Sequence, residues 1–372
     1  MKKLTTLFLL CLAIGSWAQK SLSQPPSGNN QKCVVTQFIG PVEVSIKYSS
    51  PDVHGPIGDD RKGHIWGELV HYGFTDQGFG VKTAPWRAGA NENTVISFSH
   101  DVKVEGKDIR AGMYGLFLAA AKEGPWTWVF SRNSTSWGSF SYNESEDVLR
   151  VQVNPQEAPY TEWLTYGFDD RQPASTLAYL QWESKRIPFK IGANVGEIYV
   201  DIVRNELRSP VGFDYRNWSI AAQLNAQYKI NLDEALTWAD KAMDRTIGGV
   251  EDFQTLNAKA VVLYAMARYD ESESVMDKAI RVPGTPALAI HQYGRILLNA
   301  GKKEKAMEIF KFNAAMHPED KFTPNVGLAR AYTAMGDKKN AIVHWELALK
   351  NVPESRKAEL PLYEAELKKL KL

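Results

Sequence analysis

Arginine, asparagine and glutamate occur close together near position 90 of the sequence, a combination that can recognise a polar ligand. Arg87 offers a planar fork of hydrogen-bond donors suited to a carboxylate or phosphate, Asn91 offers a donor and an acceptor, and Glu92 can act as a general base. We predict that these three residues form a ligand-binding site together with Trp86 and Tyr114. The alternative is that Arg87 and Glu92 pair with each other or with the backbone and fasten their loop.

Histidine and carboxylate side chains gather in a glycine-rich segment that precedes this loop. They are His54, Asp59, Asp60, His64 and His71. Imidazole and carboxylate groups bind zinc and other divalent ions, but the spacing here matches none of the recognised zinc patterns. We therefore predict no metal site and interpret these residues as solvated loop residues. If a metal does bind, His54, Asp59 and His64 are the candidate ligands.

Motifs that mark common enzyme classes are absent from the sequence. It has no Gly-x-Ser-x-Gly elbow, His-Glu-x-x-His helix, phosphate-binding Gly-Lys-Thr loop or dinucleotide fingerprint. This favours a non-catalytic binding or scaffold protein that needs no cofactor. The alternative is a hydrolase of an extracellular polymer, with Glu92 as acid or base, Arg87 holding an anionic group, and a metal near His54 and His64.

The composition is that of a globular protein. Of the 372 residues, 44% are hydrophobic and 23% are charged, which allows a sizeable core and excludes long disorder. The formal net charge of +1 provides no field to hold a polyanion, so we expect no nucleic-acid partner. At roughly 150 residues per domain, the length predicts two domains.

The first residues have the order of a secretory signal peptide. Lys2 and Lys3 precede an apolar run from Leu4 to Ile14, and the small residues Gly15 and Ala18 follow. The run is shorter than the roughly 20 apolar residues that a membrane-spanning helix needs. We predict cleavage after residue 18 and export to the periplasm or the extracellular space, without a membrane span.

Hydrophobic and polar residues alternate through the first half of the chain. In Val42–Tyr48 every second side chain is apolar, which is typical of a strand with one buried face. Similar runs, separated by turn residues, occur at Thr94–Ser99, Met113–Ala119, Trp126–Phe130, Val148–Val153, Trp163–Phe168, Leu177–Trp182 and Arg186–Ile191. Many short strands without helices between them predict an all-β antiparallel sandwich over residues 32–195, after the signal peptide (1–18) and a flexible lead (19–31).

From about residue 196 the spacing becomes helical and repeats. The small residues that set the period, roughly 34 to 37 residues apart, are Ala235, Ser272, Ala306 and Ala341. Small side chains at this position let the two helices of a unit approach, while larger ones four residues later fill the groove to the next unit. The predicted all-α solenoid consists of a connecting helix or linker at 196–213, four repeats at 214–353 and a capping helix at 354–372.

The helical half resembles the tetratricopeptide-repeat (TPR) family over residues 214–353, in period and in several positions. Members of that family are usually platforms that hold a peptide or a partner protein in a concave groove. The resemblance therefore implies a protein or peptide partner. No basic or aromatic stripe marks a groove in this sequence, and the alternative is that the repeats only stack on the first domain or dimerise.

The first half is similar to a family of exported bacterial proteins catalogued as domain of unknown function 2911. The motifs that carry the similarity are Ser50–Gly55, Trp86–Glu92, Ala111–Phe117, Trp137-Gly138 and Asp147–Val151. The similarity covers about residues 32–192 and implies a fold and an exported location but no reaction. Seven of the eleven tryptophans lie in this half, and aromatic faces stack on sugar rings, so a glycan or small polar molecule is the candidate ligand of the β domain. The alternative is that the aromatic residues form the core, since Trp126, Trp128 and Phe130 share one strand face.

Overall fold

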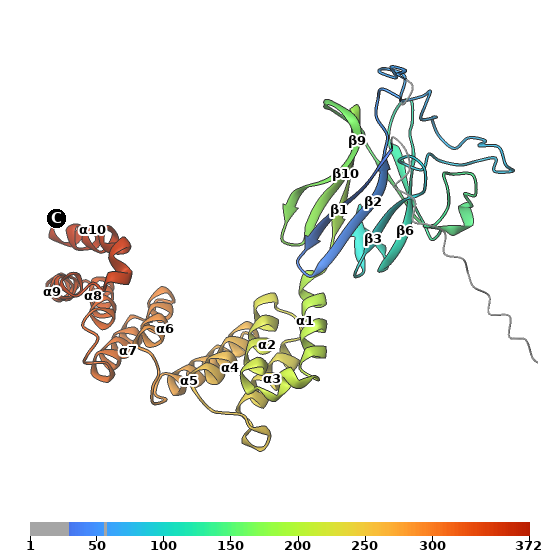
Figure 1. The fold of residues 1–372 in the computed structure, drawn as a ribbon. Coiled ribbons are helices and arrows are strands. Elements are labelled where there is room, and N and C mark those ends of the chain that lie inside the picture. Colours follow the sequence, from blue (N-terminus) through green and yellow to red (C-terminus); the bar gives the residue numbers. More distant parts are fainter. Residues whose placement is uncertain (1–29, 56–57) are drawn as a thin grey trace, which may run out of the picture. The chain divides into compact units, whose positions relative to one another are not determined.

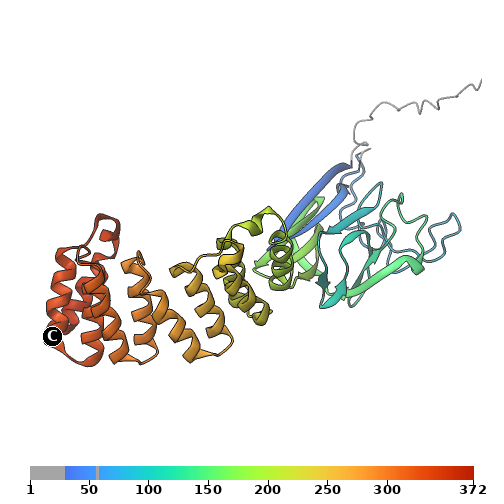
Figure 2. The ribbon, with the colours of Figure 1, turned by 90° about the horizontal axis from the view of Figure 1, so that it is seen from below.

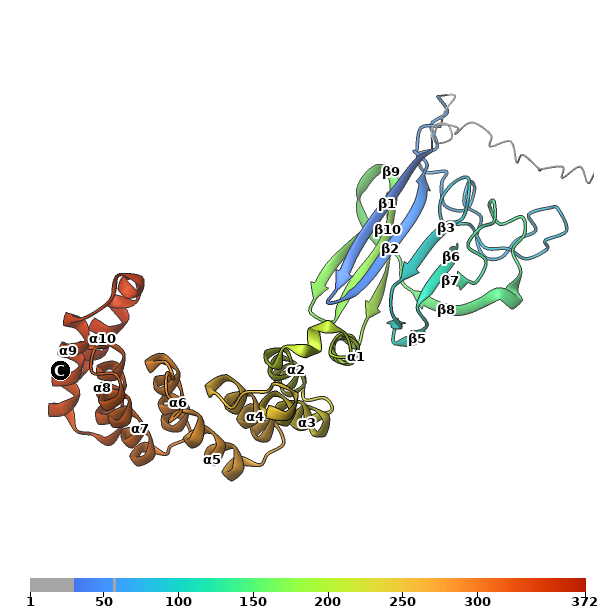
Figure 3. The same ribbon diagram turned by 60° about the horizontal axis from the view of Figure 1, so that its bottom comes forward.

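The structure is a computed structural model that describes residues 30–55 and 58–372. It contains two compact units, which meet in the sequence between Val195 and Gly196. The first unit is built of strands and the second of helices (Figures 1 and 3), which confirms the predicted order of a β domain and a helical solenoid. The predicted signal peptide lies outside the described residues. No helix in the described part of the chain is long and apolar enough to cross a membrane.

Ten β-strands of the described residues form two antiparallel sheets. They are β1 Gln31–Ile39, β2 Val42–Ser50, β3 Thr94–Phe98, β4 Val102–Val104, β5 Lys107–Ile109, β6 Gly112–Ala119, β7 Trp126–Ser131, β8 Asp147–Val153, β9 Gln156–Gln172 and β10 Ser175–Gly192. The first sheet has the strand order β1-β2-β3-β6-β7-β8, and the second has the order β5-β4-β10-β9.

Aromatic rings from both sheets form the centre of the sandwich. The Trp128 ring on β7 has its centroid 5.1 Å from that of Phe189 on β10 and 6.3 Å from that of Tyr166 on β9. The Tyr48 ring on β2 lies 4.8 Å from Tyr166. Because alternate side chains of a strand point to the same face, the alternation in Val42–Tyr48 supplies one wall of this core.

Two runs that the sequence predicts as separate strands, 177–182 and 186–191, both lie in β10. The pairing of β10 with β9 shifts register on both sides of Glu183, whose φ of 52° is left-handed. This β-bulge moves the buried face from even to odd positions: the buried residues are Ala178, Leu180 and Trp182 before it, and Ile187, Phe189 and Ile191 after it. The hydrophobic alternation is interrupted there although the strand continues.

Ten α-helices occur in the described part of the second unit. They are α1 Val195–Glu206, α2 Tyr215–Tyr228, α3 Leu232–Met243, α4 Phe253–Ala265, α5 Tyr269–Ala279, α6 Ala287–Asn299, α7 Lys303–Met316, α8 Thr323–Met335, α9 Lys338–Lys350 and α10 Leu360–Lys371. Helices α2 to α9 form four successive hairpins, which lie side by side in Figure 2. The four small residues of the sequence period are buried on the second helix of each hairpin.

The hydrophobic core of the helical unit is divided into three clusters. The first joins α1 to α4 and includes Val262, the second surrounds Phe310 and reaches from the start of α4 to α8, and the third surrounds Trp345. The first two clusters part within the second hairpin: Val262 of α4 belongs to the first, whereas Phe253, at the start of α4, packs against the second together with Met276 of α5.

The Phe310 ring is accommodated because two glycines face it. A Cβ atom at Gly294 of α6 would lie 2.5 Å from this ring, and one at Gly327 of α8 would lie 2.3 Å from it. Phe310 is fully buried, and the His291 ring lies 5.5 Å from it, centroid to centroid. Glycine at both positions therefore lets α6, α7 and α8 close around one aromatic ring.

A smaller side chain at position 310 or a larger one at position 327 should destabilise the helical unit. Phe310→Ala should lower the free energy of unfolding by about 3–5 kcal/mol because it leaves a cavity. Gly327→Ala should lower it by about 1–3 kcal/mol because the new methyl group overlaps the ring. Denaturant unfolding followed by the helical circular dichroism signal measures both. The exposed neighbour Lys311→Ala is the control, and a Phe310→Ala effect no larger than this control would contradict the packing.

His291 should make the stability of this unit depend on pH. The side chain is 6% exposed, and burial, with a smaller contribution from nearby arginines, lowers the pKa of His291 from its ordinary 6.5 to about 4. Between these values the unfolded chain binds a proton that the folded chain does not, so the free energy of unfolding should decrease as the pH falls through this window, by up to about 3 kcal/mol. The free energy of unfolding of the His291→Gln variant should decrease less than that of the original protein between about pH 7 and about pH 4.5. Equal decreases in both proteins would contradict this assignment.

Candidate binding groove between the second and third helical hairpins

The predicted ligand-binding loop lies in the connection between β2 and β3 and is attached to a second loop. The carbonyl of Asn91 accepts a hydrogen bond from the Gly138 N–H at 3.1 Å, and Glu92 forms a β-bridge with Trp137. The Arg87 Nη1 atom lies against Gly138, where a Cβ would come within 2.6 Å of it. The structure therefore brings Arg87, Asn91 and Glu92 together on one pair of loops.

The Glu92 carboxylate on this loop is paired. Its Oε1 atom lies 2.6 Å from Lys32 Nζ, and its Oε2 atom accepts a hydrogen bond from Ser49 Oγ at 3.3 Å. The Lys32 hydrogen bond lowers the pKa of Glu92, so the side chain is ionised at neutral pH and is a poor proton donor. The Arg87 Nε atom is buried without a hydrogen-bond partner, and burial lowers the pKa of this arginine.

Trp86 and Tyr114 take part in packing within the β domain. The Trp86 ring stacks on Trp182 at a centroid distance of 6.1 Å and meets the edge of Trp66 at 6.0 Å. Tyr114 on β6 is 8% exposed, and its hydroxyl donates to the Arg110 carbonyl at 2.8 Å. Both rings are thus held by their neighbours, in contrast to the partly exposed Glu92.

Of the candidate metal ligands, His54 lies near Asp60, with 3.6 Å between Nε2 and Oδ1, and each candidate has a closer partner of its own. With N–O distances of 2.7 to 2.8 Å, the pairs are His54–Glu162, Asp59–Arg61 and His64–Glu68. Hydrogen bonds to these carboxylates raise the pKa of His54 and of His64. Among the described residues, no group of three or more His, Cys, Asp and Glu side chains is arranged to hold a metal ion.

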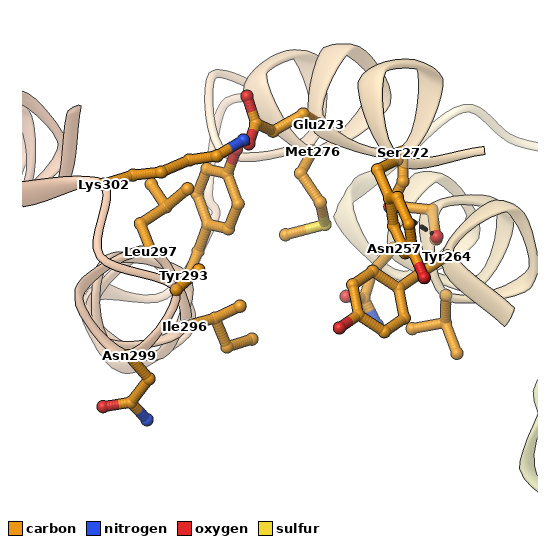
Figure 4. Close-up of a pocket in the computed structure, with 14 residues that line it drawn as sticks. Asn257, Tyr264, Ser272, Glu273, Met276, Tyr293, Ile296, Leu297, Asn299 and Lys302 are labelled. Atoms are coloured by element: carbon orange, nitrogen blue, oxygen red, sulfur yellow. Dashed lines mark hydrogen bonds and ion pairs between the residues drawn. The ribbon is translucent and has the colours of Figure 1, made fainter. Parts of the chain in front are cut away.

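A cavity of about 760 Å³ lies in the helical unit between the second and third hairpins. Side chains from α4, α5 and α6 line it (Figure 4). It lies where the first two core clusters part: α2 packs on α4 and α6 packs on α8, whereas this cavity occupies the space between α4 and α6. The division of the core therefore creates the cavity.

Exposed apolar and aromatic side chains line this cavity. Tyr264 and Val261 of α4 are 62% and 39% exposed, Tyr269 of α5 is 53% exposed, and Ile296 of α6 is 59% exposed. The Tyr264 and Tyr269 rings meet edge to face at 5.1 Å. Figure 4 shows the Met276 side chain extending from α5 into the space between α4 and α6. Exposed apolar surface gathered in a concave site favours the burial of a ligand.

A network of ion pairs and hydrogen bonds holds one edge of the cavity. Glu273 pairs with Lys302 and, at 2.8 Å, with Lys305. Lys305 also lies 2.9 Å from Asp277, which accepts a hydrogen bond from the Tyr293 hydroxyl at 3.2 Å. The lysine hydrogen bonds lower the pKa of Glu273, so the carboxylate remains charged. The network ties α5 to α6 and α7 and fixes this side of the cavity.

The cavity continues toward α2. A second cavity of about 450 Å³ shares Asn257, Val261, Tyr264 and Tyr269 with the first. We call the two cavities together the α2–α6 groove. Four side-chain amides along it form no hydrogen bond with other described residues: Gln223, Gln227, Asn257 and Asn299. A free amide offers both a donor and an acceptor, which are the groups that an extended peptide backbone requires.

None of the groove residues is recognised as a binding residue from the sequence, in which no aromatic stripe marks a groove. The aromatic pair comes from two helices, Tyr264 from α4 and Tyr269 from α5, so no spacing within one helix reveals it. The distribution of apolar residues along α4 is a sequence signal that could have indicated the groove. Val262 and Leu263 are buried, while Val261 and Tyr264 add apolar surface elsewhere on the helix, and a helix that is apolar on several faces covers more than one surface.

Comparison with solved structures finds chains of low sequence identity that match part of this chain. The crystal structure of PcrH from Pseudomonas aeruginosa matches 32% of this chain and 92% of that chain, with 16% identity and a TM-score of 0.28. The structure of YrrB, described as a TPR protein with an unusual peptide-binding site, matches 47% of this chain and 85% of that chain, with 17% identity and a TM-score of 0.32. A search of curated proteins finds no match.

The amino-terminal half matches a family model. Its description is "Protein of unknown function (DUF2911)", and the match covers residues 30–191. This range includes both sheets and the two loops that are joined at Trp86–Glu92 and Trp137-Gly138. Residues 30–191 are therefore similar to this family of unknown function, and the helical unit follows them in the sequence.

Proposed function

We propose that this chain is a non-catalytic binding or scaffold protein and that its α2–α6 groove holds an extended segment of a partner protein. The observation that carries the proposal is an uncovered apolar cavity of about 760 Å³ with unpaired amides along its course. Apolar pockets with a few well-placed polar groups are the usual form of a binding site.

The two kinds of groove residue have separate tasks in this proposal. Apolar side chains of the segment enter the cavity between Tyr264 and Ile296 and displace water from their exposed surfaces. The amides of Asn257 and Asn299 bind the N–H and C=O groups of its backbone, which would otherwise lose their hydrogen bonds to water. Tyrosine suits this role because it adds a large contact surface for few rotatable bonds.

The charges beside the cavity favour an apolar segment over a strongly charged one. Glu273 is already paired with Lys302 and Lys305, and Asp277 is paired with Lys305. A charged segment would have to break these pairs or lose its own hydration without compensation. The near-neutral composition of the chain likewise favours a protein partner over a nucleic acid.

Selection of a random peptide library on the full chain tests this function. We expect enriched peptides to share apolar residues and to bind one site. Tyr264→Ala should lower the affinity for the selected peptide at least about tenfold, because it removes a large contact from the centre of the groove. Ile296→Arg should abolish binding, because it places a charge in the apolar cavity. Isothermal titration calorimetry measures both affinities.

A matched control is available on α9, outside the groove. Val343 is 46% exposed, so Val343→Arg makes the same kind of surface change as Ile296→Arg at a distant apolar residue. We expect this variant to bind like the original protein. A library that yields no binder, or peptides that respond equally to both arginine substitutions, would contradict the proposal.

A second binding function is proposed for the β domain, with a glycan or small polar molecule as its ligand. Trp137 is 56% exposed and forms a β-bridge with Glu92, so an open aromatic face is backbone-paired with the polar loop that carries Arg87 and Asn91. Aromatic faces of this kind stack on sugar rings. The hydrolase alternative is less well supported, because Glu92 pairs with Lys32 and His54 pairs with Glu162.

Titration of the full chain with cello- and chito-oligosaccharides, followed by tryptophan fluorescence, tests the β-domain ligand. Trp137→Ala should lower the affinity for the sugar by about tenfold, because the stacking contact is lost. Trp163→Ala is the control, because Trp163 is 44% exposed on β9. Absence of binding by every sugar, or an equal loss in both variants, would argue against this site.

Export to the periplasm or the extracellular space remains part of the proposed function. It is supported by the charged, apolar and small-residue order of positions 1–18, which lie outside the described residues. An exported binding protein would meet its partner in the cell envelope or beyond it.

A further inference from the structure

A third cavity, of about 160 Å³, lies in the helical unit between α6, α8 and the segment formed by η4 (Glu354–Glu359) and α10. It shares no lining residue with the α2–α6 groove. The side chains that line it include three arginines, one histidine and one carboxylate: Arg295, Arg330, Arg356, His291 and Glu359. We call this cavity the arginine pocket.

Only one of the three guanidinium groups has a described partner. Arg356 pairs with Glu359 at 2.8 Å, and Glu359 also accepts a hydrogen bond from the Tyr363 hydroxyl. The side chains of Arg295 and Arg330 form no hydrogen bond or ion pair with any other described residue. Because arginine remains protonated in proteins, three positive charges and one negative charge leave an excess of two positive charges at the pocket.

Without a ligand, the excess of positive charge in the pocket is energetically unfavourable because of the surroundings of Arg330. Arg330 is about half-buried, and burial together with the Arg295 charge lowers the pKa of Arg330. The nearest other carboxylates are engaged: Asp320 accepts the backbone N–H groups of Phe322 and Thr323, and Glu366 pairs with Lys369 at 2.6 Å. An anion in the pocket would offset the repulsion between Arg295 and Arg330.

His291 is a further polar residue in the lining of the same pocket. It is 6% exposed, lines the pocket, and has a buried Nδ1 atom without a hydrogen-bond partner among the described residues. Buried polar atoms are almost always hydrogen-bonded, to protein or to an ordered ligand or water. The His291 side chain therefore adds a polar group to the lining of a pocket that two unpaired guanidinium groups make cationic.

We propose that the arginine pocket binds a phosphate group, either as inorganic phosphate or as the phosphomonoester of a larger ligand. Guanidinium groups match phosphate oxygens in geometry, and a phosphomonoester carries about −1.5 to −2 charges at neutral pH, which balances the excess of two. A single carboxylate would balance only half of it. The volume of about 160 Å³ equals roughly five water molecules at 30 Å³ each, enough for one tetrahedral group and the atom that carries it.

Calorimetric titration of the full chain at constant ionic strength tests the proposal with three probes: inorganic phosphate, phosphoserine and acetate. We expect saturable one-to-one binding of at least one phosphate compound and much weaker binding of acetate. Arg295→Gln and Arg330→Gln should each weaken phosphate binding at least about tenfold, because each removes charge-assisted hydrogen bonds. Arg295 is exposed, so we expect the Arg295→Gln variant to fold. It therefore tests the proposal even if the Arg330→Gln variant, changed at a half-buried position, does not fold.

Arg245→Gln is the matched control, because Arg245 is an exposed arginine of the same unit outside the pocket. It should bind phosphate like the original protein. Tighter binding of phosphoserine would identify a phosphomonoester as the ligand, and tighter binding of inorganic phosphate would identify the free ion. The proposal is overturned if neither phosphate compound binds, if acetate binds as tightly, or if Arg245→Gln loses as much affinity as Arg295→Gln.

Discussion

The interruption of the hydrophobic core between α4 and α6 is the feature on which the proposed function depends. A repeat solenoid gains its stability from contacts between neighbouring units, so a boundary without close packing leaves apolar surface exposed. Here the second hairpin contributes Val262 to one core cluster and Met276 to the next, and Tyr264 and Ile296 remain exposed between them. The same break that weakens the stack creates a concave apolar surface that a partner segment can cover.

Contacts elsewhere in the helical unit fix the helices beside this interruption of the core. Phe310, closed in by glycines on α6 and α8, fixes the third hairpin, and the network around Lys305 ties α5 to it. The arginine pocket lies on the other side of α6, so one helix contributes Ile296 to an apolar site and Arg295 to a cationic one. Adjacent residues on one rigid helix can thus serve ligands of opposite character.

Much of the fold could be predicted from the sequence, whereas the groove could not. Strand alternation in Val42–Tyr48 and the period of small residues at Ala306 and Ala341 reflect burial within one element, and such patterns are local. The bulge at Glu183 and the contact between Tyr264 and Tyr269 depend on pairing between elements, which no spacing rule contains. Similarly, the motifs around Glu92 and Trp137 are recognisable one by one, but their attachment is visible only in three dimensions.

The most direct test of the central claim uses the methionine methyl groups as reporters. Met276 projects into the α2–α6 groove, whereas Met335, 47% exposed at the end of α8, lies outside it. In a sample with ¹³C-labelled methionine methyl groups, a peptide that binds the chain should shift the Met276 resonance and leave that of Met335 unchanged. A bound peptide that leaves the Met276 resonance in place would show that the break in the core is not the binding site.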